Sequence, residues 1–146
     1  MRRYDLAMML GQEFVLKDWN WKVRVFYIVD LIPIDFIIEE LEGIGCSKED
    51  IDLAVAVLDS EDENKGITFS NFNDRESIIV IGETSCPAEF AHSYDHEKLH
   101  LAMHIARIDG IDPFSEELAY LAGDISFNMF KVAKMFLCEH CRLEIG

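Results

Sequence analysis

Basic residues and long apolar runs are scarce in this sequence. Its 146 residues include 13 lysines and arginines against 28 aspartates and glutamates, which gives a formal net charge of -15. A chain this acidic is not expected to bind nucleic acid phosphates or an anionic membrane surface unassisted. The longest apolar region, 23–38, is interrupted by Asp30, Pro33 and Asp35, which excludes a membrane-spanning helix there. We therefore expect no nucleic acid or membrane partner.

Targeting signals and cysteines are also sparse. The start of the chain is basic, but the apolar stretch 6–10 is too short for a signal peptide, and no small-residue cleavage site follows. Four cysteines in a chain without an export signal are expected to be reduced thiols. These features predict a cytoplasmic location.

Apolar residues, by contrast, make up 50% of the chain. Charge is spread along its length and no repeat or linker interrupts it, so residues 1–146 are expected to fold as one domain. Periodicity predicts strands over 19–29, 67–72 and 77–82, and helices over 34–41, 51–58, 87–108 and 114–137. Residues 1–18 are expected to be irregular or helical. This order predicts an α+β fold with a small, mostly antiparallel sheet packed on helices.

Several residues mark the expected helix ends. Ser47 is typical of the N-cap of the second helix. Thr84 or Ser85 is expected to cap the long helix that begins near Pro87. Gly110 is expected to end that helix.

The residues His96-Glu97-Lys98-Leu99-His100 read H-E-x-x-H within the long helix. Side chains four residues apart lie on one helix face, so both imidazoles can hold one metal ion. Glu97 then faces the water in the open ligand position and can take its proton, as in metal-dependent hydrolysis. The alternative is a polar helix face that carries two histidines by coincidence.

His92 and His104 continue the same spacing, but one ion cannot bind all four rings. His96 and His104 are separated by about 12 Å of helix rise. No glycine lies between His100 and His104 to turn the chain, as the metzincin arrangement of a third histidine ligand requires. His104 is therefore expected to be packed or to lie at the rim of the site. His92 is expected either to line the cleft or to be a solvated residue.

A third ligand is expected from another element, and a carboxylate is a common choice. A loop can fold the next helix back against the first, and that helix opens with Glu116 and Glu117. Register favours Glu116, because Ala119 on its face permits close approach and Tyr120 can orient a ligand. The alternative role of Glu116 is a favourable charge in the first helical turn.

The order of strand, Thr84-Ser85, H-E-x-x-H helix and Glu116-x-x-Ala119 resembles the gluzincin branch of the zincin metallopeptidases, in particular the small minigluzincins. The wider segment 79–123 is also similar to small proteins of Bacteroides phages and mobile elements. The resemblance covers roughly a third of the chain.

This resemblance implies a zincin-like fold in which His96, His100 and Glu116 hold Zn²⁺ and Glu97 is the catalytic base. It also implies that the strand before the helix, 77–82, is a sheet edge that binds the backbone of a peptide or protein substrate.

This sequence departs from the gluzincin pattern in one place. Many gluzincins carry Asp or Asn where this chain has Tyr120, and the residue that stabilises an oxyanion is left open, with Tyr94 and His92 as candidates.

Cys138 and Cys141 form a C-x-x-C pair without a second close pair. Free cysteines are therefore favoured over a structural zinc site or a redox pair.

We therefore predict a zincin-like domain with a metal site between the last two long helices, which hydrolyses peptide bonds in a zinc-dependent reaction. Two alternatives stay open. One is a non-catalytic binding or regulatory protein of a phage or mobile element that kept the fold. The other is an acidic interaction protein in which the histidines are only a surface stripe.

Overall fold

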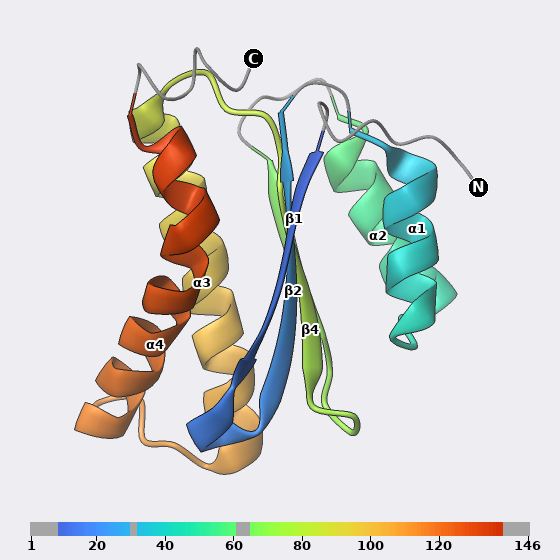
Figure 1. Ribbon diagram of the computed structural model, residues 1–146. Helices are drawn as coiled ribbons and strands as arrows, with labels where there is room; N and C mark the ends of the chain where they lie inside the picture. Colours follow the sequence, from blue (N-terminus) through green and yellow to red (C-terminus); the bar gives the residue numbers. More distant parts are fainter. Residues whose placement is uncertain (1–8, 30–31, 61–64, 139–146) are drawn as a thin grey trace.

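The computed structural model describes residues 9–29, 32–60 and 65–138, which form a mixed β-sheet between two layers of helices (Figure 1). The elements are β1 (Met9–Leu16), β2 (Trp21–Ile28), α1 (Ile34–Gly43), α2 (Lys48–Leu58), β3 (Gly66–Asn71), β4 (Glu76–Ile81), α3 (Pro87–Asp109) and α4 (Glu116–Ala133), with short 3₁₀ helices at Lys17–Trp19 and Lys134–Phe136. α1 and α2 cover one face of the sheet, and α3 and α4 cover the other. The predicted α+β class is confirmed. Within the described ranges, no helix is both long and apolar enough to cross a membrane.

The strands lie in the order β1-β2-β4-β3. β2 pairs antiparallel with β1 and parallel with β4. The strands predicted over 67–72 and 77–82 are confirmed as β3 and β4, which pair antiparallel as a hairpin. The expectation that 77–82 forms an open edge is wrong, because β4 is interior and β3 is the edge strand. A strand that is apolar at nearly every position is typical of burial on both faces, which only an interior place provides.

Alternation along the central strands divides the apolar residues into two cores. The core under α3 and α4 includes Trp21, Val23, Val25, Tyr27, Ile79, Phe90, Leu101, Ile105, Leu121 and Ile125. The core under α1 and α2 includes Phe26, Ile28, Ile37, Leu41, Ile78 and Val80. The strand predicted over 19–29 is thus confirmed as β2, and α3 is fixed to the sheet by one apolar side.

The segment 9–16 was expected to be irregular or helical, and this is wrong because it forms β1. Gln12 and Glu13 interrupt the apolar alternation, so local sequence carries little strand signal and pairing with β2 decides the structure. The Gln12 amide is used in that position: it donates to the carbonyl of Asn128 at 2.6 Å and accepts from the Tyr27 hydroxyl at 3.1 Å. Of the remaining residues of that prediction, 17 and 18 begin a short 3₁₀ helix, and 1–8 lie outside the described residues.

Helix ends follow the predicted capping residues in part. Ser47 Oγ accepts from the Asp50 amide at 3.1 Å, and Gly110 closes α3 with a φ of 66°. The last predicted helix is shorter than expected, because α4 begins after the capping residue Ser115 and a 3₁₀ turn replaces its final residues.

The start of α3 differs from the prediction. Its N-cap is Cys86, which makes no side-chain cap hydrogen bond, and neither Thr84 nor Ser85 takes that place. Pro87 occupies the first turn, where its fixed φ suits the helix and its missing N–H leaves one donor fewer to satisfy. The proline therefore starts the helix without a polar cap.

Candidate functional site

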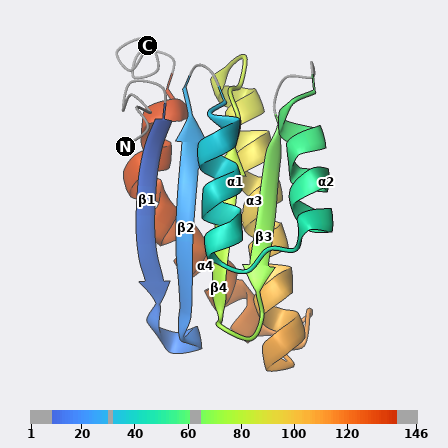
Figure 2. The same ribbon diagram turned by 90° about the vertical axis from the view of Figure 1, so that its right-hand side faces the viewer.

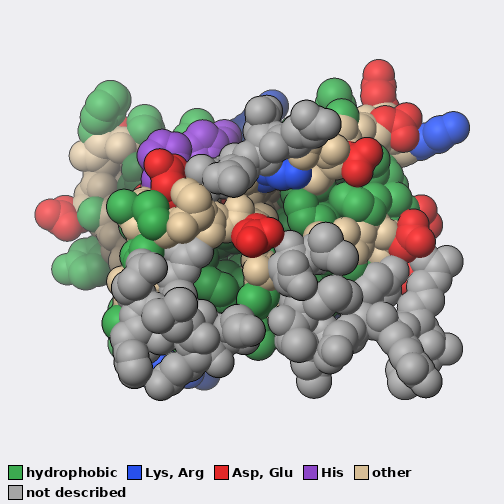
Figure 3. All heavy atoms as spheres, turned by 90° about the horizontal axis from the view of Figure 1, so that it is seen from above, with side chains coloured by type: hydrophobic (Ala, Val, Ile, Leu, Met, Phe, Trp, Pro, Cys, Tyr) green, Lys and Arg blue, Asp and Glu red, His purple; other side chains and the backbone are tan. Residues whose placement is uncertain are grey.

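Four histidines on α3 form a row of rings on the surface of the molecule. Neighbouring ring centroids are 6.3 Å apart for His92 and His96, 4.8 Å for His96 and His100, and 6.3 Å for His100 and His104. Figure 3 shows histidine side chains gathered in one place on the upper face. His92 and His96 are exposed, whereas His100 and His104 are half-buried where α3 passes β3.

The predicted pair, His96 and His100, is the closest part of this row. Their Nε2 atoms are 3.1 Å apart. Two ring nitrogens at this separation are either a hydrogen-bonded pair, with one N–H donating to the other nitrogen, or two lone pairs aimed at one cation. The turn spacing of α3 thus brings together two of the three predicted ligands.

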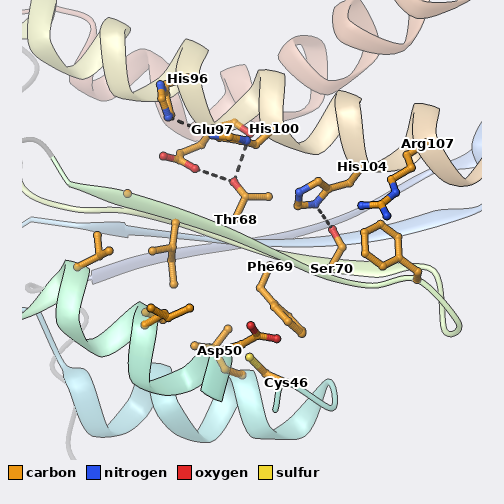
Figure 4. Close-up of a pocket in the computed structure, with 17 residues that line it drawn as sticks. Cys46, Asp50, Thr68, Phe69, Ser70, His96, Glu97, His100, His104 and Arg107 are labelled. Carbon is orange, nitrogen blue, oxygen red and sulfur yellow. Dashed lines mark hydrogen bonds between the residues drawn. The ribbon is translucent and has the colours of Figure 1, made fainter. Parts of the chain in front are cut away.

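Glu97 lies beside this pair and is only 5% exposed. Its Oε1 accepts a hydrogen bond of 2.8 Å from the Thr68 hydroxyl of β3 (Figure 4). Its Oε2 lies over Gly66, where an added Cβ would be 2.7 Å from that oxygen. The lack of a side chain at Gly66 therefore gives the carboxylate room to lie against β3, where Thr68 holds it.

The pair and Glu97 line a pocket of about 490 Å³ along the open edge of β3, between α2 and α3. Figure 2 shows α2 beside β3 at this edge of the sheet. Apolar lining is supplied by Leu53, Val57, Ile67 and Phe69. A second hollow, of about 540 Å³, shares Gly66, His96 and Glu97 with the first. The candidate site therefore lies where the two hollows meet, against the sheet edge.

Glu116 lies far from the histidine pair. The hydroxyl of Tyr94 and the ammonium of Lys98 both donate hydrogen bonds to Ser126. Ser126 of α4 therefore lies beside the turn of α3 that carries the histidine pair. Glu116 precedes Ser126 by ten residues, or about 15 Å along the helix axis. Both Glu116 and Glu117 are exposed and line neither hollow.

The side of α3 that carries His96 is also turned away from α4. His96 follows Tyr94 by two residues, which is about 200° around the helix. The pair faces β3 and α2, so it does not lie between the last two helices as we expected. In the part of the chain that the structure describes, no three His, Cys, Asp or Glu side chains gather as a metal site would require. The ligand set of His96, His100 and Glu116 stays a prediction.

His104 belongs to a hydrogen-bonded chain that enters the core. Its Nδ1 lies 2.7 Å from Ser70 Oγ, which lies 2.6 Å from Ser77 Oγ. The indole N–H of Trp21 donates to Ser77 Oγ at 2.8 Å. Ser70, Ser77 and Trp21 are all buried, so this chain links the pocket to the centre of the sheet.

The surroundings of His104 favour its neutral form. Burial lowers the pKa of His104, and the neighbouring His100 and Arg107 lower it further. The ring also packs edge-on against Phe72, with centroids 5.6 Å apart. The expectation of a packed or rim histidine is confirmed.

Other predicted residues take no part in the pocket or are not tested. The Tyr94 hydroxyl donates to the Ser126 carbonyl at 3.3 Å, toward α4, so it does not line the site. Cys46 and Cys86 are free thiols. Cys141 lies outside the described residues, which leaves the C-x-x-C prediction untested.

Sequence reasoning missed Gly66, Thr68 and Ser70. These alternate along β3, so all three face α3. Small or hydroxyl residues at every second position were the available signal. Which helix would cover that face was not readable from the strand itself.

Comparison with family models, with curated proteins and with solved structures finds no match for this chain.

Proposed function

We propose that the protein is a zinc-dependent peptidase in which His96 and His100 hold the metal and Glu97 is the general base. The supporting observation is the approach of the two Nε2 atoms to 3.1 Å beside a buried carboxylate in a pocket. Two nitrogens bound to one tetrahedral zinc at its usual bond lengths are roughly 3.3 Å apart. The pair therefore fits a shared zinc ion with little rearrangement.

Two further features of the chain suit a hydrolytic site. Zinc, when bound, would acidify a water and polarise the scissile carbonyl. Glu97 is held by Thr68 in one orientation, which suits a base that must receive a proton repeatedly from the same position. The outer edge of β3 offers backbone donors and acceptors to an extended peptide.

The proposed site requires a third ligand in addition to His96 and His100. Two histidines hold zinc less firmly than the usual three protein ligands of a catalytic site. Glu116 lies at the far end of α4. The zinc content of Glu116→Ala therefore tests directly whether Glu116 is a ligand. The same distance favours our second candidate, a non-catalytic binding or regulatory protein with this fold.

Metal content tests the first part of the proposal. Protein purified without a histidine tag should contain one zinc per chain by elemental analysis, and His96→Ala and His100→Ala should each lose it. His92→Ala removes a histidine from the same row and should retain zinc, as should Glu97→Gln. A chain without zinc, or a His92→Ala variant that loses as much as His96→Ala, would contradict the pair as a specific site. Glu116→Ala loses zinc only if Glu116 is a ligand.

Turnover tests the second part. Cleavage of a peptide library, followed by mass spectrometry, should fall by about 100-fold or more in Glu97→Gln. Circular dichroism should show that this variant folds normally. Zinc binding without cleavage would support the non-catalytic candidate, and equal cleavage by the parent and Glu97→Gln would rule out Glu97 as the base.

A further inference from the structure

The hydrogen-bonded chain behind His104 determines which ring nitrogen carries the proton. The indole N–H of Trp21 can only donate, so Ser77 Oγ accepts from it. If Ser77 donates to Ser70 and Ser70 donates to His104 Nδ1, every hydroxyl proton in the chain has an acceptor. The opposite order leaves the Ser77 hydroxyl without an acceptor among the hydrogen bonds of the described residues. An unsatisfied donor in a site this buried is costly. Nδ1 of His104 is therefore an acceptor, and Nε2 carries the proton.

The His104 side chain has a cationic neighbour in Arg107. The two residues are three positions apart on α3, and both line the 490 Å³ pocket. Figure 4 shows their side chains on the α3 side of β3, with Asp50 on the opposite side, on α2.

Arg107 makes no ion pair within the described ranges, although the chain has more than twice as many acidic as basic residues. Asp109, two residues further on, is bound instead by Arg75 through two hydrogen bonds of 2.9 Å. The neighbouring carboxylate is thus engaged elsewhere, and no anionic partner for the guanidinium beside the pocket lies among the residues that the structure describes.

We propose that His104 and Arg107 form a binding site for a carboxylate group of a peptide ligand. The imidazole N–H and the guanidinium supply hydrogen-bond donors on one helix face, and a carboxylate accepts two such bonds at once. The chain of Ser70, Ser77 and Trp21 positions the imidazole for this role.

The distance along α3 sets where this carboxylate lies in the ligand. Arg107 is seven residues from His100, or about 10.5 Å of helix rise. An extended peptide advances about 3.3 Å per residue. The carboxylate would therefore lie about three residues beyond the peptide group next to His100. The position of the carboxylate within a substrate rests on the proposed function, whereas the binding of a carboxylate by His104 and Arg107 does not.

Peptide binding to Glu97→Gln tests the site without requiring catalysis. The probes are an N-acetylated pentapeptide of alanine and leucine with a free C-terminal carboxylate and the same peptide as its C-terminal amide. A third, amidated peptide carries glutamate at its last position, and a fourth carries glutamine there. Titration calorimetry should show about tenfold tighter binding for a carboxylate-bearing peptide than for its neutral counterpart.

Replacement of Arg107 should remove this preference. Glu97→Gln/Arg107→Gln should bind acidic and neutral peptides alike, whereas Glu97→Gln/Lys131→Gln, with the same loss of charge on exposed α4, should keep the tenfold difference. A preference for the free terminus identifies a chain end, and a preference for glutamate identifies a side chain. Equal affinity for acidic and neutral peptides, or no binding at millimolar peptide, would overturn the proposal.

Nitrogen chemical shifts test the positioning role of Ser70. Side-chain NMR of the protein should show His104 as the Nε2–H tautomer, and Ser70→Ala should produce a mixture of tautomers with weaker carboxylate binding. An unchanged tautomer in Ser70→Ala would show that the hydroxyl chain does not set it. A protein that prefers acidic peptides but cleaves none supports this site and contradicts the proposed peptidase, and cleavage without an acidic preference does the reverse.

Discussion

His100 and His104 are one helical turn apart on α3, yet their polar partners differ. The Nε2 atom of His100 approaches another histidine, at the surface. The Nδ1 atom of His104 approaches a hydroxyl whose own partners lead to Trp21 in the core. The first contact involves only residues of α3, whereas the second begins a chain that joins α3 to β3, β4 and β2. Equal spacing on a helix therefore does not give equal chemistry, because the sheet beneath supplies different partners to each turn.

The largest effect is expected beside the pair of His96 and His100, where Gly66 meets the buried Glu97. Gly66→Ala places a Cβ 2.7 Å from Glu97 Oε2, so the carboxylate must leave its position. If Glu97 is the base, a displacement of this size should reduce peptide turnover about 100-fold. The free energy of unfolding should change by less than about 1 kcal/mol, because a flexible side-chain end can move away.

Gly43→Ala is the matched control for this substitution. Apart from its chain neighbours and the backbone of its own helix, a Cβ added at Gly43 would have no described atom within 4 Å, so turnover should be unchanged. Steady-state cleavage of one peptide substrate by both variants makes the comparison. Full activity in Gly66→Ala would show that Glu97 acts from another position.

The next largest effect is expected on the free energy of unfolding when the hydrogen-bonded chain behind His104 is broken. Ser77→Ala leaves the indole N–H of Trp21 without its acceptor and breaks the chain to His104. A buried donor left unpaired costs about 2 kcal/mol. His96→Ala, at an exposed position of the same helix row, should change stability by less than about 0.5 kcal/mol. Urea unfolding of both variants measures the difference in the free energy of unfolding. Equal losses of stability would show that the surroundings of His104 and of His96 do not differ in this respect.

The smallest effect is the dependence of stability on pH. The pKa of His104 is lowered from its ordinary value of 6.5. The unfolded chain therefore binds more protons than the folded one just below that pH, and the free energy of unfolding should fall as the pH drops below 6.5. This loss is complete once the pH passes the lower, folded pKa. Ser70, Phe72, His100 and Arg107 are the groups that surround the ring.

His104→Gln isolates this contribution. Urea unfolding at several pH values should show a shallower decline for His104→Gln than for the parent, and an NMR titration should place the His104 midpoint below 6.5. His92→Gln, at an exposed position of the row, should retain the decline of the parent. A steeper decline in His104→Gln would reverse the sign of the expected effect.

The sequence was sufficient to predict the elements that carry the strongest periodic patterns. The strand around Val23 and Val25, the hairpin before α3, and the helix end at Gly110 were all placed within a few residues. β1 was missed because Gln12 and Glu13 conceal its alternation. Strand order was also missed, since an apolar strand can occupy any interior place in a sheet and the neighbours of β4 lie far away in the chain.

In the candidate site too, some features follow from the sequence alone and others only from the tertiary structure. The sequence alone determined that His96 and His100 share a helix face, because the helical repeat requires it whatever surrounds the helix. Only the tertiary structure decided that Gly66 and Thr68 hold Glu97, that Glu116 lies at the far end of α4, and that His104 connects to Trp21. Contacts within one helix depend on backbone geometry, whereas contacts between elements depend on the register in which the cores pack, and that register is a property of the whole chain.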